Sequence, residues 1–432
     1  KTYDKAKVYE PLVAGNQNQM PSTVSLREYA PKRLNQGRQG SCVGWSSAYG
    51  ARTILHSRAT GKSPSQSTFS PSFLYNQIAL EGCQGAYIFE AMKSMQSVGS
   101  LPLQDFPYDE SSCGTTPGRT EKSNAQSFRI KGYNRLSMDH DKYKVNSLAV
   151  KQNLAQGAPV VIGMLVGGTF MNAMRGKAVW SPTQRDYSRS GFGGHAMCVI
   201  GYDDNKAGGS FEIMNSWGES WGDDGYCWVK YKDFDYFVRE AYGLYPMGNA
   251  KAEKISEFKL DFSLIKTKEG RAVSSVDLRK VSGTNNVFRS TEKFSAGDRF
   301  KVQVTNNLEC YIYMFNEEAD GVSNVLFPYT DKHSPYCGIT GTRVFPRDYS
   351  MVPDNVGNRD RIAVVITKVE IDYNRIKDLI NNSKQSSFEK KINSALGSFL
   401  DPAVRFKAGE AVSFTGSISE EKAVAMIIEV DK

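Results

Sequence analysis

The pattern of hydrophobic and polar positions changes partway along the chain, near residue 250. Before that point, a helix-compatible run begins at Trp45 and a second helix is predicted to start at Ser70-Pro71. Ser70 can cap unpaired N–H groups, and Pro71 suits the first turn of a helix. Apolar runs at 158–164 and 195–202 are typical of buried strands. The first part of the chain therefore mixes helices with strands.

The second part of the chain is predicted to be mostly β. After a polar linker at 248–256, turns such as Ala296-Gly297-Asp298 and Ala319-Asp320-Gly321 separate short alternating runs. The clearest of these runs are 300–304, 311–315, 362–366 and 424–428. This pattern indicates an antiparallel β-sandwich over 257–432, with one helix near 374–400. We expect Asp298 and Asp320 to form turns rather than bind metal.

Composition narrows the class of protein. The chain has 432 residues, of which 40% are hydrophobic, and its net charge is +8. Length and hydrophobic content suffice for two or more domains with sizeable cores. No run reaches the ~18 apolar residues of a membrane span. The basic residues are interspersed rather than clustered, which argues against a nucleic-acid partner.

The stretch from Gln36 to Trp45 contains a candidate nucleophile. Cys42 follows a glycine-rich turn and directly precedes the helix-compatible run. A helix N-terminus favours thiolate over thiol, and its N–H groups can also stabilise an oxyanion. The side-chain amide of Gln36 is a candidate second donor. The alternative is that Cys42 is only a small buried hydrophobic residue beside a turn.

Two later motifs favour catalysis. His195 opens an apolar run, and Asn215 begins the segment Asn215-Ser216-Trp217-Gly218. A thiol nucleophile needs a base, and the base needs a group that orients it. Alone, His195 would more often be structural, and Asn215 would more often be a turn residue. Together with Cys42 they supply all three roles.

These three motifs occur in the order found in papain-like cysteine peptidases, and residues 21–247 resemble that family. The resemblance implies an α+β, two-subdomain fold, helical on the left and β-barrel-like on the right, after an N-terminal extension at 1–20. It makes Cys42 the nucleophile, His195 the acid and base, Asn215 its orienter and Gln36 an oxyanion donor. In the second domain, the segments 294–298, 311–313 and 325–328 resemble a β-rich domain of unassigned function that is appended to bacterial peptidases and kinases.

The resemblance also implies which residues bind the substrate. Ala86 stands where the family usually has glycine, so its methyl group is expected to crowd the substrate backbone. Tyr87 is either part of this segment or a core residue. Small residues at Gly163 and Gly194 predict a roomy pocket for bulky apolar or aromatic side chains. The implied residues are Gly85, Ala86, Tyr87, Gly163, Gly194, Trp217 and Trp221.

The seven cysteines suggest an oxidising setting. Cys83 and Cys113 occupy family positions, but the usual partner of each is absent, so the resemblance implies that they pair with each other. Two weaker candidate bridges are Cys198–Cys227 and Cys310–Cys337. The alternative is that these four are buried free thiols. With Lys1 rather than Met first, we expect a secreted, periplasmic or cell-surface protein.

The sequence therefore predicts a cysteine peptidase that acts on a peptide or protein substrate and needs no cofactor or metal. Neither a propeptide-like helix nor a nucleic-acid or membrane-spanning partner is predicted. The second domain is expected to bind a surface ligand, a partner protein or the peptidase domain. Two alternatives stay open: a catalytically silent binding or adhesion protein, and a transpeptidase that uses the same acyl-enzyme.

Overall fold

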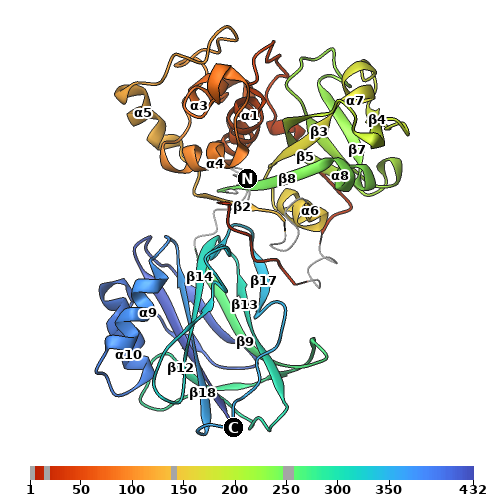
Figure 1. Cartoon of the computed structure of the whole chain (residues 1–432). Coiled ribbons are helices and arrows are strands. Elements are labelled where there is room, and N and C mark those ends of the chain that lie inside the picture. The colour runs from red at the N-terminus through yellow and green to blue at the C-terminus, as the bar shows by residue number, and fades with distance from the viewer. Residues whose placement is uncertain (1–4, 14–19, 138–143, 247–256) are drawn as a thin grey trace. The chain divides into compact units, whose positions relative to one another are not determined.

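The computed structural model describes residues 5–13, 20–137, 144–246 and 257–432. These residues form two compact units, 5–9 with 20–246 and 10–13 with 257–432. In the first unit, helices gather on one side and a β-sheet on the other (Figure 1). The linker predicted at 248–256 lies outside the described residues.

The helical side of the first unit is built around one long helix that begins at Cys42. It continues from α1 through a π-helical segment, η4, into α2, and it ends at Gly61, which adopts the left-handed conformation. Ser70 caps α3 as predicted, because its Oγ accepts a hydrogen bond from Phe73 N at 2.9 Å. The helices are α1 (Cys42–Gly44), η4 (Trp45–Arg52), α2 (Thr53–Thr60), α3 (Pro71–Tyr75), α4 (Ile88–Ser97) and α5 (Arg119–Ala125).

The β side of the first unit is an eight-stranded sheet with the order β2-β8-β3-β5-β6-β7-β4, and β1 pairs with β5. The long helix packs closely on it, because a Cβ at Gly50 would lie 3.3 Å from Cys198 Cβ. Helices α6 (Ser147–Ala155), α7 (Gly168–Asn172) and α8 (Tyr231–Phe237) belong to the same unit. The strands are β1 (Thr23–Ser25), β2 (Gly132–Arg135), β3 (Val160–Val166), β4 (Val179–Trp180), β5 (Gly193–Asp203), β6 (Ser210–Met214), β7 (Tyr226–Lys230) and β8 (Val238–Tyr245).

The second unit is a sandwich whose two sheets share one apolar core. The predicted runs at 300–304, 311–315, 362–366 and 424–428 lie in β13, β14, β18 and β21. The first sheet contains β9 (Phe258–Lys268), β10 (Arg271–Val276), β13 (Arg299–Asn306), β17 (Gly341–Phe345), β19 (Phe406–Lys407) and β20 (Val412–Gly416). The second contains β11 (Leu278–Lys280), β12 (Val287–Ser290), β14 (Cys310–Glu317), β15 (Val325–Phe327), β16 (Tyr336–Cys337), β18 (Arg359–Thr367) and β21 (Ala423–Asp431).

The single helix expected near 374–400 is instead two helices, α9 (Tyr373–Asn382) and α10 (Phe388–Leu396). The chain leaves the helical conformation at Ser383, which is extended. Ser387 then caps α10, since its Oγ accepts a hydrogen bond from Lys390 N. Asp298 and Asp320 form turns as expected, because their carboxylates accept backbone N–H bonds from Ser295 and Val322.

The described part of the N-terminal extension is divided between the two units, with 5–9 in the first and 10–13 in the second. Val8 forms a parallel bridge with Arg135, whose guanidinium donates to the carbonyl of Ala6 in the first unit. In the second unit, the buried Arg343 donates to the Glu10 carbonyl at 3.0 Å. Burial raises the pKa of the Glu10 side chain to about 7.

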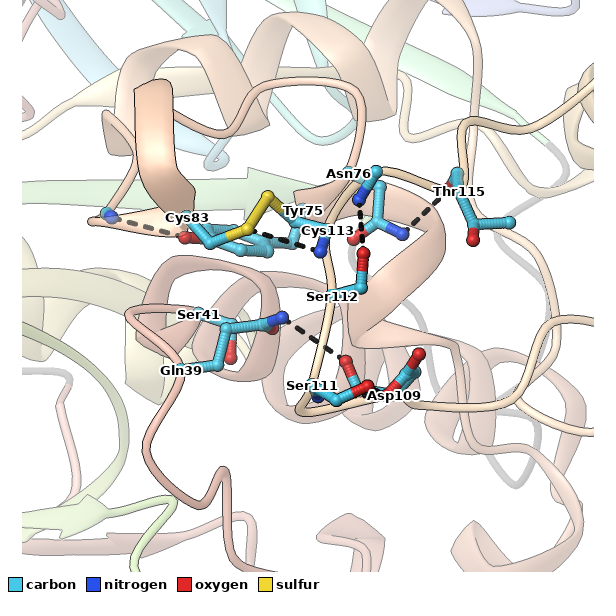
Figure 2. The surroundings of a disulfide bond; sticks show 12 residues. Gln39, Ser41, Tyr75, Asn76, Cys83, Asp109, Ser111, Ser112, Cys113 and Thr115 are labelled. Atoms are coloured by element: carbon cyan, nitrogen blue, oxygen red, sulfur yellow. Dashed lines mark hydrogen bonds between the residues drawn. A yellow bond between two sulfur atoms is a disulfide. The ribbon is translucent and has the colours of Figure 1, made fainter.

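The bridge between Cys83 and Cys113 is present, as the resemblance implied. Figure 2 shows it beside the segment that carries Asp109, whose carbonyl accepts a 3.2 Å hydrogen bond from Gln39. The bridge therefore fastens two segments that flank the loop before Cys42.

The other two candidate bridges are wrong, because all four cysteines are buried free thiols. Cys198 lies on β5 and Cys227 on β7, with β6 between them. Two strand spacings amount to roughly 9–10 Å, which exceeds the reach of a disulfide. Cys310 and Cys337 face each other across β14 and β16 but remain thiols.

Loss of the Cys83–Cys113 bridge should destabilise the first unit. The bridge closes a loop with a sequence separation of 30 residues. For a loop of this length, the double substitution Cys83→Ser/Cys113→Ser should lower the free energy of unfolding by about 3 kcal/mol. Urea unfolding of wild type with and without reductant supplies the control. Equal midpoints for oxidised wild type and the double variant would contradict the prediction.

Candidate functional site

Cys42 lies in the first turn of the long helix, where backbone N–H groups lack helical partners. Its Sγ accepts a hydrogen bond from Ala196 N at 3.4 Å. The backbone N–H groups of Val43 and Cys42 also favour the thiolate form of this side chain. The sulfur is therefore partly buried against the residue that follows His195, where backbone N–H groups favour its charged form.

His195 stands near the start of β5, with its ring held on two sides. Its Nε2 is 2.8 Å from Asn215 Oδ1, an oxygen that can only accept, so Nε2–H is the donor. The ring of Trp217 stacks on the imidazole with 4.5 Å between centroids and covers the pair. Because Nε2 carries the proton, Nδ1 of the neutral ring is left as the acceptor.

Burial disfavours a charge on Cys42 alone and a charge on His195 alone. It raises the pKa of the Cys42 thiol, while the three N–H groups act in the opposite direction. It lowers the pKa of His195 to about 4, and the hydrogen bond to Asn215 partly offsets that effect. A charged state at this site is therefore favourable only when thiolate and imidazolium form together.

Gln36 is fixed at both ends of its side chain. Its Nε2 donates to the Gln39 carbonyl at 2.9 Å, and its Oε1 accepts from Ser216 Oγ at 2.7 Å. An amide nitrogen carries two hydrogens, so one N–H is left for another acceptor. The backbone N–H of Gln36 also donates to Ser216 O at 2.8 Å, which joins its loop to the Asn215 segment.

Tyr108 and Ser216 support this loop, and sequence reasoning did not assign them roles. The hydroxyl of Tyr108 donates to the Gln36 carbonyl at 2.7 Å and lies 2.7 Å from Ser41 Oγ. Ser216 holds the Gln36 amide. Only its position within the Asn-Ser-Trp-Gly motif marked Ser216 in the sequence, and nothing local marked the hydroxyl of Tyr108.

The segment Gly85-Ala86-Tyr87 lies beside the same loop. Gly85 has a positive φ of 123°, and its N–H donates to Tyr75 Oη at 3.1 Å. Gly40 N donates to the Cys83 carbonyl at 3.3 Å. Tyr87 is 46% exposed, so the core alternative for this residue is wrong.

The two tryptophans contribute mainly by packing. Trp221 is buried, donates from Nε1 to the Phe170 carbonyl at 3.0 Å, and meets the ring of Trp217 edge-on. Gly194 borders open space, since no atom lies within 4 Å of where its Cβ would be. Gly163 does not leave the room that we expected, because the side chain of Glu240 occupies it.

Among the residues that the structure describes, no group of three or more His, Cys, Asp or Glu side chains is arranged to hold a metal ion. Within the same ranges, no helix has the length and apolar character that crossing a bilayer requires.

Comparison with known proteins agrees with this geometry. The family model for papain family cysteine proteases matches residues 20–244, which is more than half of the chain. Mouse cathepsin K is 28% identical over 232 residues, which span 52% of this chain and 64% of that protein. An uncharacterised peptidase C1-like protein of Acanthamoeba polyphaga mimivirus is 28% identical over 211 residues, 47% of this chain and 65% of the viral protein.

Among solved structures, xylellain, a cysteine protease from Xylella fastidiosa, is 25% identical with a TM-score of 0.44, covering 55% of this chain and 91% of that one. The chain spans less than two thirds of the length of the two relatives named above. A helical half and a β half that bring cysteine, histidine and asparagine together define a papain-like domain. The chain belongs to the papain family of cysteine proteases.

Close backbone contact at Gly40 should make the site intolerant of a single methyl group there. A Cβ at Gly40 would lie 2.8 Å from Gly85 N and 3.0 Å from the Cys83 carbonyl oxygen. Gly40→Ala should therefore lower the free energy of unfolding by about 1–3 kcal/mol in urea titration. Gly194→Ala adds the same methyl in open space and should change it by less than about 0.5 kcal/mol. Equal effects of the two substitutions would contradict this packing.

Proposed function

We propose that this protein is a cysteine peptidase that hydrolyses peptide bonds through Cys42, His195 and Asn215. One observation carries the proposal: Cys42 Sγ, at a helix N-terminus, contacts the His195–Ala196 peptide, while Asn215 and Trp217 fix the His195 ring. Nucleophile, base and orienter thus occupy the places that thiol acyl transfer requires. Gln36 supplies a preorganised donor.

In the first half-reaction, the Cys42 proton moves to His195 Nδ1, and the thiolate sulfur attacks the scissile carbonyl carbon. The resulting oxyanion accepts hydrogen bonds from Gln36 Nε2 and the Cys42 N–H. The carbon–nitrogen bond then breaks as His195 gives its proton to the leaving amine. The product is a thioester between Cys42 and the acyl part of the substrate.

In the second half-reaction, neutral His195 removes a proton from water, and the hydroxide attacks the thioester carbon. The carbon–sulfur bond breaks, the peptide acid leaves, and the imidazolium returns its proton to Cys42 sulfur or remains paired with the thiolate. Asn215 keeps Nε2–H engaged throughout, so Nδ1 stays the nitrogen that exchanges protons.

We further propose that the enzyme acts outside the cytoplasm. The Cys83–Cys113 bridge supports this location, because structural disulfides persist mainly in oxidising compartments.

Removing the Gln36 donor should slow turnover without disabling the nucleophile. Gln36→Ala is expected to lower kcat on a fluorogenic peptide by about 10²-fold, the usual cost of one lost oxyanion donor. Ser216→Ala leaves the amide in place but releases its oxygen, so a smaller loss is expected. Full activity of Gln36→Ala would rule out its role as an oxyanion donor.

The pH profile of Cys42 alkylation tests the thiolate–imidazolium pair. With His195 present, we expect iodoacetamide to react between pH 5 and 8. In His195→Ala the thiol has no partner, and burial keeps its pKa above the ordinary value. At pH 7 the thiolate fraction is then about 1% or less. Alkylation should therefore fall about 10²-fold and recover only above about pH 9. An unchanged profile would contradict the pair.

A further inference from the structure

The second unit has an open cavity that is lined by residues of both its sheets. The cavity has a volume of 280 Å³, close to the lower limit of about 300–1,000 Å³ for small-ligand sites. Its walls come mainly from β13, β14, β18 and the loop between β17 and β18. Each of the strands β13, β14 and β18 already has a hydrogen-bonded neighbour on both sides. An extended peptide therefore cannot pair with these strands, and side chains must provide most of the binding.

The loop between β17 and β18 exposes an aromatic side chain at this cavity. Tyr349 lines the cavity and is 59% exposed. The loop itself is fastened, because Met351 exchanges two backbone hydrogen bonds of 2.9 Å with Phe300. Farther along the loop, Lys432 Nζ donates to the Asp354 carboxylate. A loop that is held in place while it exposes an aromatic ring beside a cavity is typical of a binding surface.

Most of the charged side chains that line the cavity are compensated within the protein. Glu317 pairs with Arg361 at 3.3 Å and with Lys391 at 2.8 Å. Asp360 pairs with Lys432 at 2.7 Å. Carboxylates and guanidinium groups in such pairs can still exchange hydrogen bonds with a ligand, but they present little net charge. The lining therefore suits a neutral ligand with several hydroxyl groups better than it suits an ion.

A smaller apolar cavity adjoins the larger one. Its volume is 10 Å³, and Leu326, Tyr349 and Met351 line both cavities. Its remaining lining residues are also apolar. A water molecule there would find few hydrogen-bond partners, so a space of this size suits one methyl-sized group.

We propose that the larger cavity is a saccharide site that binds an N-acetylhexosamine. A pyranose ring combines an apolar face with hydroxyl groups at its edge, which matches an exposed tyrosine beside paired charged groups. The apolar face of the ring packs on Tyr349, and the hydroxyl groups bond with Asp360 and Arg361. The acetamido methyl group enters the smaller cavity. This inference does not depend on the peptidase function proposed above.

The test is isothermal titration calorimetry of the full-length chain with triacetylchitotriose and with cellotriose, which has the same linked rings but no acetamido groups. Wild type should bind triacetylchitotriose at least about tenfold more tightly, because cellotriose leaves the methyl space empty. Tyr349→Ala should raise the Kd for triacetylchitotriose about tenfold. Phe399→Ala removes a ring of the same unit that is 44% exposed and does not line the cavity, so this matched control should keep the wild-type Kd.

Glu318→Gln distinguishes a saccharide from a basic peptide. Glu318 lines the cavity, and its Oε1 accepts a hydrogen bond from Asn316 Nδ2 at 2.5 Å. Because the proposed ligand is neutral, loss of this charge should change the Kd for triacetylchitotriose by less than about threefold. Trilysine is titrated as the competing ligand, and it should not bind.

Three results would overturn the saccharide site. The first is no saturable binding of triacetylchitotriose by folded wild type. The second is equal affinity for the two saccharides or an unchanged Kd in Tyr349→Ala. The third is binding of trilysine in place of the saccharides, lost in Glu318→Gln, which would assign the cavity to a basic peptide. None of these results bears on the peptidase proposal.

Discussion

The hydrogen bonds between two loops determine the geometry of the candidate site. One loop carries Gln36 and leads into Cys42, and the other carries Asn215 and Trp217. They are joined where Gln36 N donates to Ser216 O at 2.8 Å, Ser216 Oγ donates to Gln36 Oε1 at 2.7 Å, and Gly218 N donates to the Leu34 carbonyl at 3.1 Å. Because the nucleophile belongs to the helical half and the base to the sheet, their alignment depends on this connection.

The ionisation of the side chains at the site depends on their burial, because little water reaches them. Burial disfavours a lone thiolate at Cys42 and a lone imidazolium at His195. Helix amides and the Ala196 N–H favour the thiolate, whereas Asn215 favours the imidazolium. The same half-buried environment gives Glu240 a carboxyl pKa of about 7. Few water molecules compete at such positions, so a partner charge supplied by the protein has a large effect.

Much of the fold and of the candidate site was predictable from the sequence at positions where the local structure requires particular residue types. Cys42 before a helix, and the cap at Ser70, are visible in short sequence windows. The Cys83–Cys113 bridge was predictable only through the family resemblance. The features that we did not predict depend on strand register and on contacts between residues far apart in the sequence. No local pattern indicates that Glu240 will lie over Gly163, or that Cys198 and Cys227 will be separated by β6.

The break between α9 and α10 illustrates a different limit. Ser383 and Ser387 were both visible in the sequence, but isolated serines in a polar stretch are also common inside and around helices. Only the extended conformation at Ser383 and the cap at Ser387 distinguish two helices from one.

The most direct test of the central claim is intact-mass analysis after treatment with an epoxide inhibitor of the E-64 type, on wild type and Cys42→Ala. An activated thiol in an open cleft predicts a single adduct on wild type and none on the variant. No adduct on folded wild type, or an adduct that persists in Cys42→Ala, would contradict the assignment of Cys42 as the nucleophile.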